Sequence, residues 1–299
     1  MPDLLRLIAL FGIVVVNVGY MAFPATSGVP ESTINGPMDH VATALMRGIA
    51  EGKTYGLFSF MFGVGLGFQM RSAERRGLPF GKLYRNRMIG LILLGLAHGI
   101  FFFAGDILVI YAITGSILFL FRNFEPRRLI WIGGALLVLQ TLLVLAFTAA
   151  PVGFDPEFAA IERDIMTDGG VIDVLFFRAI SYGFTFPFLL IYQGFAALGW
   201  FCLGLAALKG GLIEDRGHPL WRRARRLCLV PGVVLSLMGA MLAVYGQGLA
   251  GNLVLVAVAP VATLGYLGLI AFLARPAGPI MSAFLKAGGS SLSVYLGQS

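Results

Sequence analysis

Long apolar stretches recur along the whole of this 299-residue chain and are separated by short polar connections. Each approaches the roughly 20 apolar residues that an α-helix needs to cross a bilayer. Only 12% of the residues are charged, against about 25% in ordinary soluble domains, which excludes a soluble fold. The sequence therefore predicts an all-α, polytopic transmembrane helix bundle. We expect about nine spans, near residues 5–23, 54–70, 88–104, 107–121, 129–149, 183–208, 227–246, 252–274 and 283–299.

The loops between these spans differ in charge, and this difference predicts a topology. Lysine and arginine gather in alternate loops, at 71–87, 122–128, 209–226 and 275–286. The longest intervening loop, at about 150–178, is rich in aspartate and glutamate instead. Because cytoplasmic loops carry the excess of lysine and arginine, we expect a cytoplasmic N terminus and a multi-pass protein of the bacterial inner membrane.

The remaining composition argues against several other classes of protein. The net charge of +7 comes from short basic clusters and not from one basic face, so we expect the lipid bilayer as a partner and no nucleic acid. Cys202 and Cys228 lie in or beside apolar stretches and lack ligand-like spacing to any histidine. We therefore expect neither a disulfide nor a metal site.

Residues 1–299 are expected to form a single transmembrane domain, because no long linker or internal repeat divides them. The final residues, Gly297–Ser299, lie inside an apolar segment without a stop signal. We therefore expect the domain to continue with further C-terminal helices. A homo-oligomer is compatible with such a chain.

The leading candidate for chemistry is His98, in the stretch Gly95-Leu-Ala-His98-Gly99 near the extracytoplasmic end of a predicted span. Ionisable groups at membrane depth are costly and mark functional sites, and histidine suits general acid–base chemistry near neutral pH. Asp106 follows in a turn so short that the flanking helices must form a hairpin. The alternative is structural: His98 would bond a backbone carbonyl, and Asp106 would cap the next helix.

Polar residues also mark the first two predicted spans. Asp3 and Arg6 can pair on a helix, and Asn17 lies deeper in the same span; the alternative roles are an interfacial anchor for Arg6 and an interhelical hydrogen bond for Asn17. Glu51 and Lys53 lie on different faces of the second helix, so we do not expect them to pair. Weaker candidates are His40, expected in a solvated loop, Arg47, Tyr192 and Gln193.

A glycine-rich run, Gly63-Val-Gly65-Leu-Gly67, follows in the second span. It lacks the preceding strand and the lysine of a phosphate-binding loop. We expect Gly63 and Gly67 to allow close helix packing instead.

Taken together, these residues resemble the YeiB-like family of bacterial membrane proteins, which is described as a domain of unknown function. The matching motifs run in order along nearly the whole chain. They are Asp3-x-x-Arg6 with Asn17, Glu51-Gly-Lys53 with Phe62-Gly63-x-Gly65, Gly95-x-x-His98 through Asp106-Ile-Leu108, Tyr111-Ala112, and Ser291-Leu-Ser-x-Tyr295-x-x-Gln298.

That family is in turn remotely similar to the transmembrane acyltransferases, which include sugar O-acetyltransferases and the lysosomal heparan glucosaminide N-acetyltransferase. Those proteins also begin with Asp-x-x-Arg in their first catalytic-domain helix. In many O-acetyltransferases a histidine follows the arginine by eleven residues, where this chain has Asn17. A catalytic base would therefore have to be His98 or, less favoured, His40.

The resemblance implies an enzyme that transfers an acyl group from cytoplasmic acyl-CoA to a hydroxyl or amine of a lipid or glycan acceptor. His98 would act as base, oriented by Asp106 or by Asn17. No tightly bound cofactor is expected; Arg85 and Arg87 would attract the phosphates of the donor. The expected substrate-binding residues are Asp3, Arg6, Glu51, Lys53, Tyr111 and Gln298.

Two other functions compete with this one. A transporter or flippase of a small or lipid-like solute would use His98 as a proton relay, and such proteins often contain paired broken helices. A non-catalytic assembly subunit would use every polar residue for packing.

Overall fold

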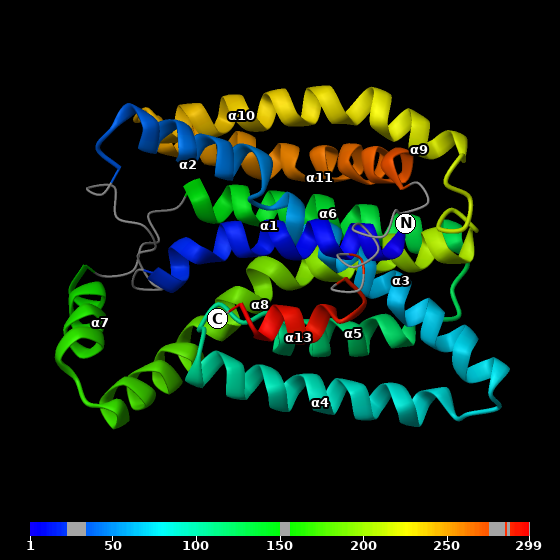
Figure 1. The fold of residues 1–299 in the computed structure, drawn as a ribbon, viewed down its shortest axis with the longest axis horizontal. Helices are drawn as coiled ribbons and strands as arrows, with labels where there is room; N and C mark the ends of the chain where they lie inside the picture. The colour runs from blue at the N-terminus through cyan, green and yellow to red at the C-terminus, as the bar shows by residue number, and fades with distance from the viewer. Residues whose placement is uncertain (23–33, 150–155, 275–284, 286–287, 299) are drawn as a thin grey trace.

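The computed structural model describes residues 1–22, 34–149, 156–274, 285 and 288–298. Within these ranges the chain is helical and contains no strand, so the predicted all-α class is confirmed. Most of the helices lie side by side along one common direction, and α7 stands across it at one end (Figure 1). They are α1 (Pro2–Ala22), α2 (Pro37–Ile49), α3 (Lys53–Arg75), α4 (Phe80–Phe101), α5 (Leu108–Leu120), α6 (Pro126–Ala149), α7 (Pro156–Asp168), α8 (Val171–Lys209), α9 (Pro219–Ala224), α10 (Val230–Val244), α11 (Gly248–Leu273) and α13 (Ser291–Leu296).

Eight of the nine predicted spans fall on these helices, whereas the ninth, 283–299, lies partly outside the described residues and contains the short helix α13. Five helical segments are long and apolar enough to cross a membrane: α1, α6, α8, the continuous α9–α10 segment and α11. This is the architecture of a membrane protein. Helix α5 is apolar but shorter, and the count of nine crossings stays a prediction.

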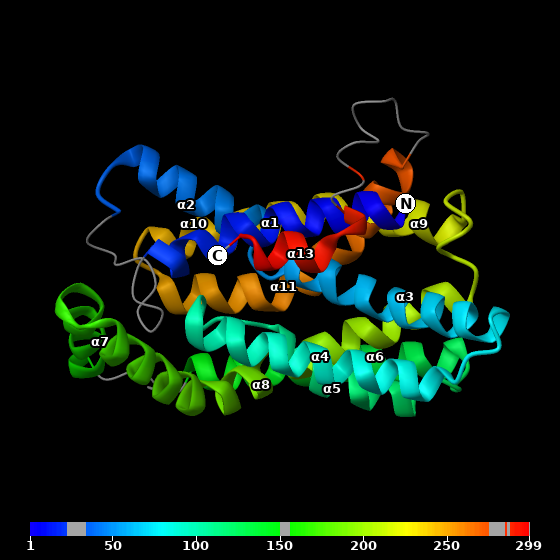
Figure 2. The same ribbon diagram turned by 60° about the horizontal axis from the view of Figure 1, so that its bottom comes forward.

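The two ends of the bundle differ in which connections they hold. The N terminus lies at the same end as the α3–α4, α5–α6 and α8–α9 turns (Figures 1 and 2). These turns belong to the basic loops of the sequence, so the predicted segregation of positive charge is present along the bundle axis. Arg275 and Lys286, which were assigned to the same side, lie outside the described residues.

Two helices were missed in stretches expected to be loops. Helix α2 begins at Pro37, and the Asp39 carboxylate accepts a hydrogen bond from the Gly36 backbone N–H at 3.0 Å. Helix α7 occupies part of the acidic loop, and α8 begins at Val171 rather than near residue 183. At 1.5 Å per residue, α8 is about 58 Å long, roughly twice the hydrocarbon thickness, and so longer than one crossing needs.

The centre of the bundle is the crossing of α3 and α8, where the backbones approach closely. A methyl group added at Gly63 would overlap the carbonyl of Phe201, and one added at Gly204 would overlap the carbonyl of Phe60. At Gly67 it would meet the side chain of Leu208. The glycine-rich run thus has the packing role expected of it. Helices α1, α4, α5 and α13 surround this crossing and carry the polar residues considered next (Figure 2).

Candidate functional site

His98 and Asp106 form a buried ionisable pair inside the bundle. Nδ1 of His98 lies 2.7 Å from Oδ2 of Asp106, and the two residues are 4% and 1% exposed. The second carboxylate oxygen, Oδ1, accepts a hydrogen bond from the Leu108 backbone N–H at 2.8 Å. Because both oxygens of Asp106 have partners, the carboxylate is held rigidly between the end of α4 and the start of α5.

The α4–α5 hairpin brings these residues together, and its glycines make the space. The Phe102 N–H donates to the His98 carbonyl at 2.9 Å as α4 ends. A Cβ at Gly95 would lie 2.9 Å from Asp106 Oδ1, and one at Gly99 would lie 2.7 Å from the ring of Tyr182 in α8. The spacing Gly95-x-x-His98-Gly99 therefore places one glycine against the carboxylate and another against a neighbouring helix.

Two tyrosines distant in sequence complete the surroundings of the pair. Oη of Tyr295 in α13 lies 3.4 Å from Asp106 Oδ2 and accepts from the Ile107 N–H at 3.3 Å. The rings of His98 and Tyr295 are 5.5 Å apart. Tyr182 is also buried, and its hydroxyl has no hydrogen-bond partner among the described residues. Neither tyrosine was selected as a site residue from the sequence.

This arrangement suits proton transfer through His98. An ionised carboxylate only accepts hydrogen bonds, so the Asp106 contact places a proton on Nδ1. In that tautomer, Nε2 is the ring atom that accepts a proton. The structural role is fulfilled at the same time, because Asp106 also satisfies a backbone N–H in the first turn of α5.

A row of aromatic rings runs from His98 toward the basic end of the bundle. The distances between successive ring centres are 6.3 Å from Tyr295 to Phe58, 5.7 Å from Phe58 to Tyr111 and 5.4 Å from Tyr111 to Phe62. The guanidinium of Arg87 stands 5.0 Å from the Phe62 ring centre. Tyr111 is fully enclosed, with its hydroxyl 2.6 Å from Ser59 Oγ.

The positively charged guanidinium of Arg87 lies at the far end of this aromatic row. Its Nη1 is buried without a hydrogen-bond partner among the described residues, and Arg6 is near enough to repel its charge. Arg6 itself pairs with Asp3 at 3.0 Å, as the spacing indicated. Arg85 is exposed, so the structure separates the two arginines that the sequence had grouped.

The other expected substrate-binding residues lie at two further places. Arg47 Nε donates to Glu51 Oε2 at 2.7 Å, and Lys53 Nζ donates to the Arg47 carbonyl at 3.1 Å. Glu51 thus pairs with Arg47 and not with Lys53. Gln298 lies elsewhere, with its Nε2 3.5 Å from the Leu10 carbonyl of α1.

Two residues considered as partners or substitutes of His98 have other surroundings. Asn17 is half-buried on α1, and its side chain makes no hydrogen bond within the described part of the chain. His40 lies on α2, where its ring centre is 5.2 Å from that of Tyr245 in the α10–α11 turn. Asp106 is therefore the residue that the structure places against the His98 ring.

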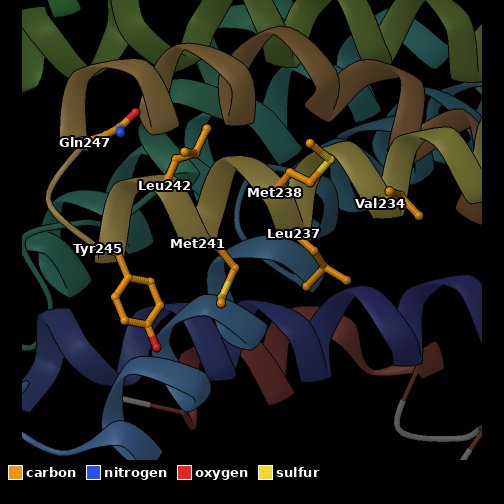
Figure 3. Close-up of a pocket in the computed structure, with 7 residues that line it drawn as sticks. All are labelled: Val234, Leu237, Met238, Met241, Leu242, Tyr245 and Gln247. Atoms are coloured by element: carbon orange, nitrogen blue, oxygen red, sulfur yellow. The ribbon is translucent and has the colours of Figure 1, made fainter.

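A hollow of about 540 Å³ lies elsewhere, along α10. Its lining is almost wholly apolar, and Leu237, Met241 and Tyr245 point from α10 toward α2 (Figure 3). Its walls come from α10 and the α10–α11 turn, whereas His98 and Asp106 belong to the α4–α5 hairpin. The hollow therefore has the lining expected of a lipid-facing surface and holds none of the candidate catalytic residues.

Comparison with known proteins finds relatives that are themselves uncharacterized. The chain is 27% identical to the uncharacterized protein YeiB of Escherichia coli over 248 residues, which cover 79% of this chain and 62% of YeiB. It is 35% identical to the uncharacterized protein YxaH of Bacillus subtilis over 136 residues, which cover 43% of this chain and 34% of YxaH. The chain thus spans less than two thirds of either relative. No family model and no solved structure matches it.

Proposed function

Taking the similarity to YeiB-like proteins as a premise, we propose that this chain is part of a multi-pass inner-membrane acyltransferase. The enzyme would move an acyl group from cytoplasmic acyl-CoA to a hydroxyl or amine of a lipid or glycan at the membrane or its outer face. His98 is the base in this proposal, and Asp106 is its positioning residue. The N terminus and the basic turns would face the cytoplasm, as their charge indicates.

The observation that carries the proposal is the enclosed His98–Asp106 pair, 2.7 Å apart. A histidine oriented by a carboxylate is an arrangement that suits general base catalysis. Such ionisable groups are expensive inside a membrane. Packing alone would be served as well by apolar side chains, so the pair favours a chemical role over a purely structural subunit.

The reaction balances without any further reagent. Nε2 of His98 takes the proton from the acceptor hydroxyl or amine as its oxygen or nitrogen attacks the thioester carbon. The carbon–sulfur bond then breaks, and the imidazolium returns the proton to the departing thiolate. The products are the acylated acceptor and free CoA, and the histidine is restored.

The donor would have to reach His98 from the basic end of the bundle. Arg87 and His98 lie on the same helix, eleven residues apart, which is about 16 Å along its axis. A donor held by its phosphates at Arg87 therefore needs a long arm between phosphate and thioester, as acyl-CoA has. The aromatic row from Phe62 to Tyr295 joins these two positions but is buried at Tyr111 and Tyr295, so the helices around it would have to part for that arm to follow it.

The test uses the purified protein in nanodiscs with acetyl-CoA and longer acyl-CoAs, and it measures both binding and release of free CoA. His98→Gln should bind the donor normally and release CoA at least about 100-fold more slowly, the contribution typical of a general base. His218→Asn is the matched control, because asparagine retains the capping role of His218 at α9. An undiminished rate in His98→Gln would contradict the assignment of the base.

A second pair of variants examines the donor end. Arg87→Gln should weaken acyl-CoA binding about tenfold, because it removes a half-buried guanidinium whose N–H groups can form charge-assisted bonds to phosphate. Lys82→Gln removes an exposed charge from the same helix and should leave binding unchanged. Equal losses in both variants would argue for nonspecific attraction by the basic loop.

Transport is the second candidate, and one observation favours it. The chain breaks between α2 and α3 at Gly52, whose φ is +77°, and broken helices beside charged residues are typical of transporters. Solute movement in liposomes without consumption of acyl-CoA would support transport. Saturable binding of acyl-CoA with His98-dependent CoA release would support acyl transfer.

A further inference from the structure

The α2–α3 junction holds more positive than negative charge. Arg47 and Lys53 supply two cations, and Glu51 supplies the single carboxylate bonded within this group. Arg47 is also tied to α11, because its Nη2 donates to Asn252 Oδ1 at 2.6 Å. The junction therefore carries one uncompensated positive charge inside the bundle.

Lys53 is the cation of the junction that lacks a carboxylate partner among the described residues. Its exposure is 0%, and its ammonium group, which can donate three hydrogen bonds, donates one, to the Arg47 carbonyl. No ion pair involves it within the described residues. Lys53 is also the first residue of α3, where the helix dipole is positive and disfavours a cation. Its one hydrogen bond caps a carbonyl in the last turn of α2, and the remaining N–H groups of the ammonium are left for a ligand.

The junction is nevertheless reachable from the surface of the protein. Gly52 is exposed, and the Glu51 side chain is 35% exposed, compared with 23% for Arg47. Glu51 can therefore swing outward without disturbing the core. Such a movement would leave Arg47 and Lys53 as neighbouring donors below an opening.

We propose that the α2–α3 junction is a binding site for an anionic group, a phosphate or a carboxylate, held by Lys53 and Arg47. Glu51 occupies the position of the ligand when the site is empty and is displaced when the ligand binds. The positive end of the α3 dipole adds to the attraction. This site is separate from the His98–Asp106 pair and does not depend on acyl transfer.

The proposal makes opposite predictions for two conservative variants. Lys53→Met should weaken anion binding at least about 30-fold, the effect of removing one partner from a buried charge pair. The same variant should raise the melting temperature of the ligand-free protein, because a desolvated cation is replaced by an apolar side chain. Glu51→Gln removes the internal competitor and should tighten anion binding severalfold.

The measurement is the melting temperature of the purified full chain in phosphatidylcholine nanodiscs, titrated with inorganic phosphate at constant ionic strength. A second series replaces part of the lipid with phosphatidic acid and counts retained lipids by native mass spectrometry. A saturable response to inorganic phosphate identifies a soluble anion, and a response to phosphatidic acid alone identifies a lipid headgroup. Lys82→Met is the control for the loss of one positive charge at an exposed position.

Three results would overturn the proposal. They are no response of the wild type to either probe, an unchanged response in Lys53→Met, and weaker binding in Glu51→Gln. If Lys53→Met does not fold, the Glu51→Gln result still decides. His98→Gln should bind the anion as the wild type does, so a failure of the proposed acyl transfer would leave this test intact.

Discussion

The α4–α5 hairpin and the α2–α3 junction both hold ionisable groups inside the bundle, but they differ in how many hydrogen-bond and ion-pair partners these groups have. At the hairpin, both oxygens of Asp106 have partners, and one partner is His98. At the junction, the single carboxylate of Glu51 is bonded to Arg47, and the buried ammonium of Lys53 makes one hydrogen bond, to a backbone carbonyl. The hairpin is complete without a ligand, which suits a group that must be held in place. The junction is incomplete, which suits a group that binds something.

The sharpest way to break this comparison is to remove the carboxylate of the hairpin. Asp106→Ala leaves the His98 ring and the Leu108 N–H without their acceptor, and it should lower the free energy of unfolding by about 3 kcal/mol. Acyl transfer should be lost as well. Unfolding of the detergent-solubilised protein measures the first effect, with exposed Asp168→Asn as the control. A change below about 1 kcal/mol would show that the pair is less satisfied than its geometry indicates.

The second prediction concerns the space that Gly95 provides. Gly95→Ala places a methyl group 2.9 Å from Asp106 Oδ1 and 2.8 Å from Val109, so it should cost about 2 kcal/mol through overpacking. Gly90→Ala is a matched control on the same helix, because nothing lies within 4 Å of the added methyl. That variant should be neutral or slightly stabilising. Equal stability of the two variants would mean that the hairpin adjusts and does not hold the carboxylate rigidly.

The third prediction examines the hydrogen bond that lies between the two regions. Tyr111→Phe leaves Ser59 Oγ buried without its partner at 2.6 Å and should cost about 1 kcal/mol. The double variant with Ser59→Ala should cost less than the sum of the single variants, because both act on the same bond. Strict additivity in unfolding measurements would show that the two hydroxyls are not coupled.

The smallest effect is expected at Tyr295. Its hydroxyl contacts are long, 3.3 Å and 3.4 Å, so Tyr295→Phe should change stability by less than about 1 kcal/mol. The variant should lower the rate of CoA release only a few-fold. A loss of CoA release as large as that in Asp106→Ala would show that Tyr295 contributes as much to the reaction as the Asp106 carboxylate does. The CoA release assay described above measures this difference.

Local patterns in the sequence were enough for much of the fold and for half of the candidate site. Apolar length predicted where helices lie, and the short turn before Asp106 placed His98 and its partner in one hairpin. Helix α2 was missed although Pro37 and Asp39 are ordinary signals of a helix start. Without that helix, the pairing of Arg47 with Glu51 at four residues' spacing could not be predicted.

Contacts between distant segments were beyond the reach of the same patterns. Tyr295 lies 189 residues from Asp106, and Tyr182 packs against Gly99 from another helix. Arg85 and Arg87 looked equivalent in the sequence, but only Arg87 has a buried guanidinium nitrogen and a neighbouring aromatic ring. Which face of α4 points inward depends on its neighbours and not on its own residues.

By itself, the sequence determined that the protein belongs in a lipid bilayer, where most helices lie, and which end of the bundle carries positive charge. These properties follow from apolar length and charge counted along short segments, and they need no knowledge of how the helices meet. Only the tertiary structure decided that Lys53 is fully buried while Glu51 is turned toward Arg47. The burial and partners of a charge depend on helices that are far apart in the chain, and their meeting is set by packing.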